Sequence, residues 1–150
     1  MLGIGNWFAV RDGEIDAAAM YHRHYSYANY RAKKPKLFVG PGVKVVLMTP
    51  ERGALFVWRK FIDKSGQQGI NCAIFRNERP DLYQSSALIL EAEQLAWDKW
   101  PGERLYTYVN AKKVKSVNPG YCFKMAGWKP CGFTVSRKLL ILEKLPEWSV

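Results

Sequence analysis

The stretch Ser116-Val-Asn-Pro-Gly-Tyr-Cys-Phe-Lys-Met-Ala-Gly-Trp128 decides how the second half of this chain is expected to fold. It lies between two β-type runs, Arg104–Val109 and Lys138–Leu142. We interpret it as a short helix that connects two strands. Glycine followed by a hydrophobic residue, as in Gly127-Trp128, also ends helices in folds of any kind, because glycine readily takes the left-handed conformation.

Length and composition indicate one ordered domain over residues 1–150. The chain is 48% hydrophobic and 14% aromatic, which excludes a disordered protein. No run reaches the roughly 18 apolar residues of a membrane span, and the N-terminus lacks the pattern of a signal peptide. The three cysteines match no zinc or disulfide spacing. We therefore expect a reduced, cytoplasmic protein that is not bound to a membrane.

A net charge of +10 favours an anionic partner, through long-range attraction and the release of counterions. Coenzyme A and nucleic acid are both anions of this kind. The alternative is a basic surface that only aids solubility.

The first half of the chain predicts a helix and then a strand meander. The apolar residues of Asp12–His24, among them Ile15, recur at the spacing of one helix face, and Asp12 is the expected N-cap. Tyr25–Lys36 is polar, aromatic and basic, and is expected to be a loop. Three strands with short connections then predict antiparallel pairing; they are Val43–Met48, Ala54–Lys60 and Ile70–Phe75.

Ser85–Trp97 is the strongest helix prediction. Ser85 or Ser86 is expected to cap it, and one face is apolar, with Leu88, Ala92, Leu95 and Ala96. A strand, a short helix and a last strand follow. We therefore expect an α+β (α/β) fold with a mixed, mainly antiparallel central sheet flanked by helices. A generic α+β sandwich is the alternative.

Two features resemble the GNAT superfamily of acyltransferases. Phe123-Lys-Met-Ala-Gly-Trp128 is similar to the Tyr-x-Lys-x-Gly-Phe ending of that family, and the predicted element order is similar to the GNAT core. The resemblance implies a cleft for acetyl-CoA or another acyl-CoA between two central strands. It therefore predicts that Ile70–Phe75 lies beside Leu105–Val109 at one end and separates from it at the other.

The resemblance also implies where the cofactor binds. In the family, backbone amides at the start of the long helix hold the pyrophosphate, as helix N-termini do for anions generally. The residues that correspond here to the cofactor site are Phe75, Arg76, Asn77, Arg79, Ser85, Ser86, Ala87, Ser116, Asn118 and Phe123. Unlike the family, this chain has no glycine in the loop before the helix, and simple helix capping is the alternative for the two serines.

Acyl transfer needs a base, a stabilised oxyanion and an acid for the leaving thiolate. When Gly127-Trp128 is aligned with the family's Gly-Phe, Phe123 takes the position of the tyrosine that acts as the acid, and phenylalanine cannot donate a proton. We prefer Tyr121 as the acid, with Cys122 as an alternative, and the resemblance points to His24 as base and to Asn110 in the site floor. Each of these residues also has a purely structural interpretation: Tyr121 as a packing residue, His24 as part of a polar helix end, and Asn110 as a turn residue. The spacing of the histidines indicates no metal site.

The acceptor is expected to be anionic. Tyrosines and cations interleave in one segment, which suits nucleic acid because cations follow phosphates and rings stack on bases. The expected substrate-binding residues are Tyr25, Tyr30, Lys33, Lys34 and Lys36, together with Lys112 and Lys113 of a second basic cluster.

In size, charge and the style of its C-terminal half, the chain is similar to small phage-encoded GNAT-like proteins, among them Mom-type DNA-modification proteins. That similarity implies an N-acyltransferase that acts on nucleobases in DNA. The alternatives are an N-acetyltransferase of a small amine or protein amine, and a non-enzymatic binding protein of the same fold. The acyl group, the acceptor atom and the oligomeric state do not follow from the sequence.

Overall fold

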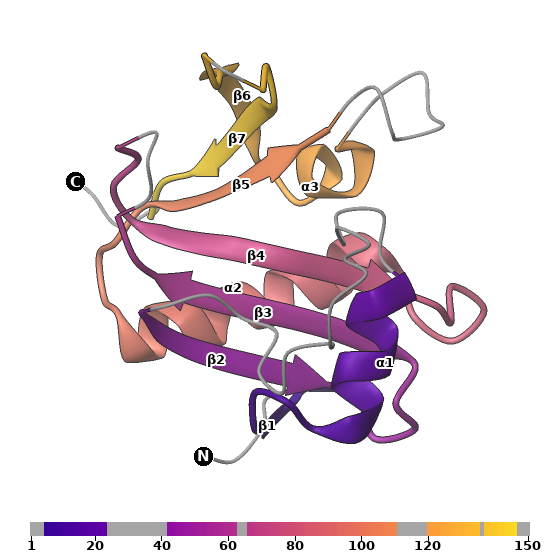
Figure 1. Cartoon of the computed structure of the whole chain (residues 1–150). Helices are drawn as coiled ribbons and strands as arrows, with labels where there is room; N and C mark the ends of the chain where they lie inside the picture. The colour runs from indigo at the N-terminus through magenta and orange to yellow at the C-terminus, as the bar shows by residue number, and fades with distance from the viewer. Residues whose placement is uncertain (1–4, 24–41, 63–65, 111–119, 136, 147–150) are drawn as a thin grey trace.

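The computed structural model describes residues 5–23, 42–62, 66–110, 120–135 and 137–146. Within these ranges the chain forms one sheet of seven strands and three helices (Figure 1). Neighbouring strands are antiparallel except for one central pair, so the predicted α+β class with a mixed, mainly antiparallel sheet is confirmed.

The strands lie in the spatial order β1-β2-β3-β4-β5-β7-β6. In chain order the elements are β1 (Phe8–Val10), α1 (Ile15–Arg23), β2 (Val43–Met48), β3 (Ala54–Lys60), β4 (Ile70–Asn77), α2 (Ser85–Lys99), β5 (Leu105–Val109), α3 (Tyr121–Met125), β6 (Lys129–Phe133) and β7 (Leu140–Lys144).

The predicted meander of β2, β3 and β4 is confirmed, with β2 and β3 at the predicted bounds. Two strands were not predicted. β1 has only three residues, too few for an alternating pattern to show. β6 has the sequence Lys-Pro-Cys-Gly-Phe, and proline and glycine are rare in strands. Proline is tolerated in β6 because this strand lies at the edge of the sheet and pairs with β7 alone.

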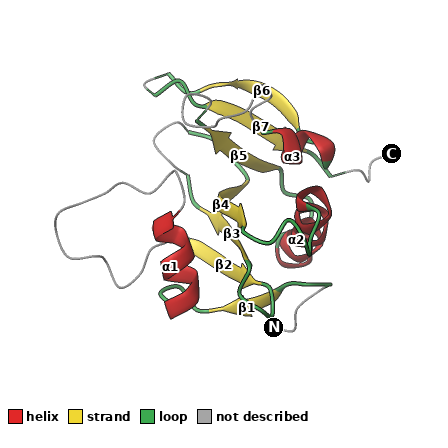
Figure 2. Cartoon of the chain, turned by 90° about the vertical axis from the view of Figure 1, so that its right-hand side faces the viewer, coloured by secondary structure: helices red, strands yellow, loops and turns green. Residues whose placement is uncertain are grey.

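The helices cover opposite faces of the sheet. Figure 2 shows α1 on one side and α2 with α3 on the other. The predicted apolar face of α2 is confirmed, because its four residues are buried; they are Leu88, Ala92, Leu95 and Ala96. α1 differs from the prediction: it buries Ala17 and Met20, whereas Ile15 is 82% exposed. Asp12 is not its N-cap, since the helix begins at Ile15 and the Asp12 carboxylate pairs with Lys44 at 2.8 Å.

Two tryptophan side chains bind α2 to the sheet side of the fold through hydrogen bonds. The indole N–H of Trp7 donates to the Leu88 carbonyl at 2.8 Å, and that of Trp58 donates to the Ala92 carbonyl at 2.9 Å. Because a buried indole N–H without an acceptor would be costly, these bonds fix both the position and the rotation of the helix.

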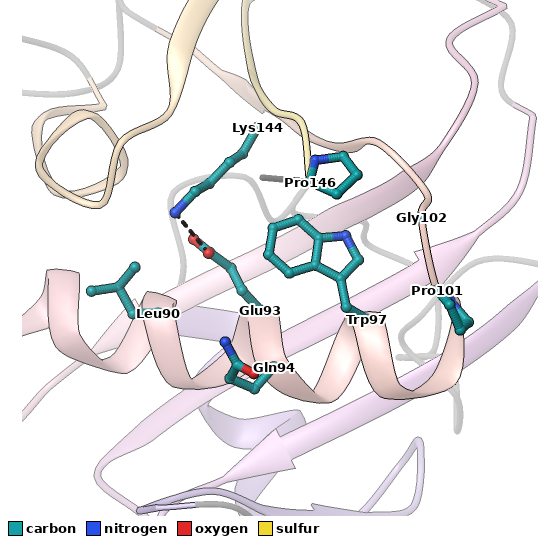
Figure 3. A pocket seen from close by; sticks show the side chains of 8 residues that line it. All are labelled: Leu90, Glu93, Gln94, Trp97, Pro101, Gly102, Lys144 and Pro146. Carbon is teal, nitrogen blue, oxygen red and sulfur yellow. Dashed lines mark hydrogen bonds and ion pairs between the residues drawn. The ribbon is translucent and has the colours of Figure 1, made fainter. Parts of the chain in front are cut away.

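A buried ion pair joins α2 to α3 and β7. Glu93 is 2% exposed; one carboxylate oxygen accepts from the Lys144 ammonium and the other from the Trp128 indole, both at 2.8 Å. Lys144 also donates to the Ala126 carbonyl at 2.7 Å. Figure 3 shows Lys144 reaching down to Glu93 on the helix. The pair therefore connects three elements that are separate in the sequence.

Replacing Glu93 by Leu should destabilise the protein by about 3–5 kcal/mol, because the buried Lys144 ammonium would lose its counter-charge. The double variant Glu93→Leu/Lys144→Leu should recover part of that loss. Urea unfolding of the wild type and these variants measures both values. If the double variant is no more stable than the single one, the unpaired buried charge of Lys144 is not the cause of the destabilisation.

Candidate functional site

The central strands β4 and β5 separate after a short parallel contact. They pair only at Ile70–Leu105, Asn71–Tyr106 and Cys72–Thr107. The rest of β4, from Ala73 to Asn77, pairs with β3 alone or not at all, and the end of β5 pairs with β7. Figure 1 shows β5 turning away from β4 beyond the contact. The predicted separation of these two strands is confirmed.

A β-bulge lies at the point where the strands part. In the pairing of β3 with β4, Val57 faces Ile74 and Trp58 faces Cys72, so Ala73 has no partner in the register. Bulges bend a strand and increase its twist, and they are frequent next to active sites. On the opposite side, the Thr107 hydroxyl donates to the Cys72 carbonyl at 3.0 Å in the last pair. The bulge thus supplies a local physical cause for the separation.

Aromatic rings fill the α2 side of the separation. The rings of Phe75 on β4 and Phe123 on α3 meet edge to face, with centroids 5.9 Å apart. Phe123 in turn packs against Trp128 at 4.9 Å and is only 7% exposed. The structure therefore brings together two residues of the predicted cofactor site, Phe75 and Phe123, and holds Phe123 within the core.

Gly127 and Trp128 close the short helix α3. The Trp128 N–H donates to the Phe123 carbonyl and the Gly127 N–H to the Lys124 carbonyl, both at 3.0 Å. Gly127 has a φ of +94°, so the residues form a Schellman motif. The interpretation of Gly127-Trp128 as a helix C-terminus is confirmed, and this role needs no ligand.

The two candidate acids lie at the start of α3. Tyr121 is the first residue of the helix and its side chain is 55% exposed. Cys122 is partly buried, and burial raises the pKa of its thiol. Cys122 therefore stays protonated at neutral pH, while Tyr121 is the candidate that reaches solvent.

The Asn77 side chain organises the loop between β4 and α2. Its amide group donates to the Tyr83 carbonyl at 3.0 Å and to the Ser85 hydroxyl at 3.1 Å, and its oxygen accepts from the Arg79 N–H at 2.9 Å. Three predicted cofactor residues, Asn77, Arg79 and Ser85, are thus brought together. Their contacts set where α2 begins relative to β4.

The N-terminus of α2 has no side-chain cap. Its N-cap residue is Gln84, which makes no capping hydrogen bond, and the first turn has no acidic residue. The predicted capping by Ser85 or Ser86 is therefore wrong: both serines are inside the helix. Amides in a first helical turn lack intrahelical acceptors, so the N–H groups of Ser86 and Ala87 can donate hydrogen bonds to an anion.

The arginines near this helix start are paired with carboxylates. Arg76 contacts Glu78 at 2.6 Å, Arg23 of α1 contacts Glu78 at 2.8 Å, and Arg79 forms a two-pronged pair with Asp81. Hydrogen bonds from Arg23 and then Arg76 lower the pKa of Glu78 to about 2. The charges of Arg76 and Arg79, expected to neutralise phosphate, are thus balanced within the fold.

The remaining predicted residues are placed only in part. Asn110 is partly buried and directly follows β5, at the end where the strands separate. The others lie outside the described residues; they are His24, Tyr25, Tyr30, Lys33, Lys34, Lys36, Lys112, Lys113, Ser116 and Asn118. Sequence reasoning missed Ala73, because a bulge is a property of pairing and leaves no pattern in a short apolar run.

A pocket lies at the opposite end of the sheet. It is a pocket of about 540 Å³ between α2 and the end of β7, with Trp97, Pro146 and the Glu93–Lys144 pair among its walls (Figure 3). Lys144 pairs with Leu105 at the start of β5, so this pocket is remote from the separation of the strands. None of the predicted site residues lines it.

Comparisons with known proteins give no information about this site. No protein-family model, curated protein or solved structure matches this chain. In the part of the chain that the structure describes, no three His, Cys, Asp or Glu side chains are grouped to hold a metal ion. Within the same ranges, no helix has the length and apolar character to cross a membrane.

Replacing Glu78 by Gln should lower the free energy of unfolding by about 1–2 kcal/mol at pH 7, because both of its ion pairs are lost. The pKa of Glu78 is lower in the fold than its ordinary value of 4.5. Its stabilisation is therefore complete above about pH 4.5 and disappears as the pH falls toward 2. Urea unfolding across this range should show the two proteins converging.

The matched control is Asp81→Asn, which removes a more exposed ion pair and should have no measurable effect at any pH. A difference between wild type and Glu78→Gln that does not change with pH would contradict the assignment.

Proposed function

We propose that this chain is a GNAT-type N-acyltransferase that takes an acyl group from acyl-CoA and modifies nucleobases in DNA, as a phage-type cytoplasmic protein. The observation that carries the proposal is the separation of β4 and β5 at a bulge, beside the uncapped start of α2. Motif and element order support the same family.

The separated strands suit the amide-containing arm of coenzyme A. Beyond Cys72, the edge of β4 no longer pairs with β5, and an exposed strand edge binds extended amide chains as it would bind a further strand. The pyrophosphate would then lie at the start of α2, held by the amides of Ser86 and Ala87. Lacking glycines in the loop, the chain relies on the small side chains at these positions for close approach.

The chemistry would be shared between backbone and side chains. Acyl-CoA supplies an activated thioester carbonyl when bound. The bulge at Ala73 turns backbone polar groups of β4 out of the ladder, and such groups can stabilise negative charge on an acyl oxygen. We assign Tyr121 as the acid, since its hydroxyl is exposed at the start of α3 and can return a proton to the leaving sulfur. His24 is the assigned base and Asn110 part of the floor.

The acceptor assignment rests on charge. The net charge is +10, the segment Tyr25–Lys36 interleaves cations with tyrosines, and Lys112–Lys115 is a second basic cluster. These features support DNA over a small amine or a protein amine, because a small acceptor needs no extended basic surface.

A non-enzymatic binding protein is the second candidate, and two observations favour it. Phe123 occupies the position of the family's acidic tyrosine and is buried in an aromatic cluster. Arg76 and Arg79 are already paired with carboxylates, so less positive charge is available for a pyrophosphate. Turnover of acetyl-CoA in the presence of DNA separates this candidate from the enzyme.

Replacing Ser86 by Pro removes one amide donor at the start of α2. Affinity for acetyl-CoA, measured by calorimetry, should fall about tenfold or more, because a hydrogen bond to a charged group contributes about 1.5–3 kcal/mol. The matched control Ser86→Ala keeps the amide and should bind as the wild type does. Equal affinity of all three proteins would place the pyrophosphate elsewhere, and no binding by the wild type would refute the acyl-CoA assignment.

Replacing Lys33, Lys34 and Lys36 by Ala should weaken DNA binding and flatten its dependence on salt, since fewer counterions are released. Replacing Tyr25 or Tyr30 should cost about 1–3 kcal/mol per stacked base on single-stranded DNA. Fluorescence anisotropy at two salt concentrations measures both effects. Absent or salt-independent binding by the intact protein would favour the small-amine alternative.

A further inference from the structure

The hairpin of β6 and β7 ends beside the separated strands. Phe133, the last residue of β6, pairs with Leu140 of β7, and Leu140 also pairs with Val109 at the end of β5. The turn between β6 and β7 therefore lies at the end of the sheet where β4 and β5 have parted. Figure 1 shows this hairpin projecting from the sheet above β5.

The turn is held by its own hydrogen bonds. The Thr134 N–H donates to the Leu139 carbonyl, and the Leu139 N–H donates back to the Thr134 hydroxyl, both at 2.9 Å. The Lys138 N–H donates to the Thr134 carbonyl at 3.1 Å, and Lys138 has a φ of +54°. These bonds fix the described residues of the turn as a formed projection on the sheet.

The tip exposes both apolar and cationic side chains. Phe133 is 65% exposed and Val135 is 93% exposed. Arg137 and Lys138 are also exposed, and the stretch from Lys129 to Leu139 contains no acidic residue. The tip therefore combines an exposed aromatic ring and an exposed aliphatic side chain with two cations in one short stretch of chain.

Arg137 and Lys138 at the tip form no ion pair with the described residues, which is also true of Arg11, Arg59 and Lys99. Ion pairs bind eight other cations; these are Arg23, Lys44, Arg52, Lys60, Arg76, Arg79, Arg104 and Lys144. Neither Arg137 nor Lys138 takes part in these pairs. Their charge is available to an anionic partner.

We propose that the β6–β7 tip, meaning Phe133, Val135, Arg137 and Lys138, is a nucleic-acid contact. Arg137 and Lys138 bind backbone phosphates, while Phe133 and Val135 pack against bases and help to open the stack. This proposal rests on the proposed function, because a base in DNA must leave the stack to reach a site between β4 and β5. An anionic membrane fits the tip less well, since two apolar side chains give little buried area for attachment.

The test compares two double variants of the full chain. The probes are fluorescein-labelled duplex and single-stranded oligonucleotides of one mixed sequence, titrated between about 50 and 200 mM salt. Arg137→Ala/Lys138→Ala should reduce the slope of log affinity against log salt by about 1.8 on duplex DNA. Phe133→Ala/Val135→Ser should lower affinity about tenfold and leave the slope unchanged.

Ile62→Ala is the matched control. Ile62 is 67% exposed and follows β3 at Lys60, which lies at the opposite end of the sheet from the hairpin tip. This variant should bind DNA as the wild type does. Thermal unfolding of all variants should agree, because every substituted side chain is exposed. A double variant that unfolds early is replaced by its two single variants, each of which should give about half of the effect.

Other outcomes overturn the proposal. Wild-type binding by both hairpin variants removes the tip from the interface, as does an intact protein that binds no DNA. Hairpin-dependent binding to phosphatidylserine vesicles in place of DNA, or a dimer that the apolar variant dissociates, would identify a different partner. Acetyl-CoA calorimetry on the same proteins separates the two proposals. A wild type that binds DNA through the tip but does not bind acetyl-CoA refutes the acyltransferase alone, and a wild type that binds acetyl-CoA while the tip variants bind DNA normally refutes the tip alone.

Discussion

Three residue pairs hold the two halves of the sheet together: Ile70–Leu105, Asn71–Tyr106 and Cys72–Thr107. β4 and β5 are parallel, and α2 is the crossover connection that such a pair requires. The contact ends where β4 bulges at Ala73. The start of α2 follows the far end of β4, while the start of α3 and the β6–β7 turn lie at the far end of β5, so all three are at the end of the sheet where the strands have separated. Had the ladder continued along β4, the strand edges proposed to bind the acyl donor would be occupied by each other.

Several polar interactions that stabilise the fold lie away from the separation of the strands. Indole groups anchor α2 through Leu88 and Ala92, and the buried Glu93–Lys144 pair joins the same helix to β7. A helix held so firmly along its length presents its first turn in a fixed position. That matters for the proposed function, because backbone amides bind an anion well only when they are already oriented toward it.

Charge pairing changes where an anion is expected to bind. Arg76 and Arg79 lie near the start of α2, yet each is paired with a carboxylate. Anion binding there would depend on backbone amides more than on side-chain charge. The unpaired cations of the described part include Arg137 and Lys138 at the hairpin tip, so the proposed site for a small anion and the proposed surface for a larger anionic partner lie on different elements. The same pairing is what makes a purely binding role the second candidate.

The sequence by itself determined the elements whose signals are local. Strands β2 and β3, the apolar face of α2 and the helix end at Gly127-Trp128 follow from alternation, periodicity and the conformational freedom of glycine. It also predicted that β4 and β5 would part, through resemblance and element order. Only the tertiary structure decided the bulge at Ala73 and the edge strand β6 with its proline. It also decided the ion pairs, in which Asp12 binds Lys44 and Arg76 binds a carboxylate. Each of these depends on contacts between residues far apart in the chain, or on the register of one strand against another, and neither leaves a local pattern in the sequence.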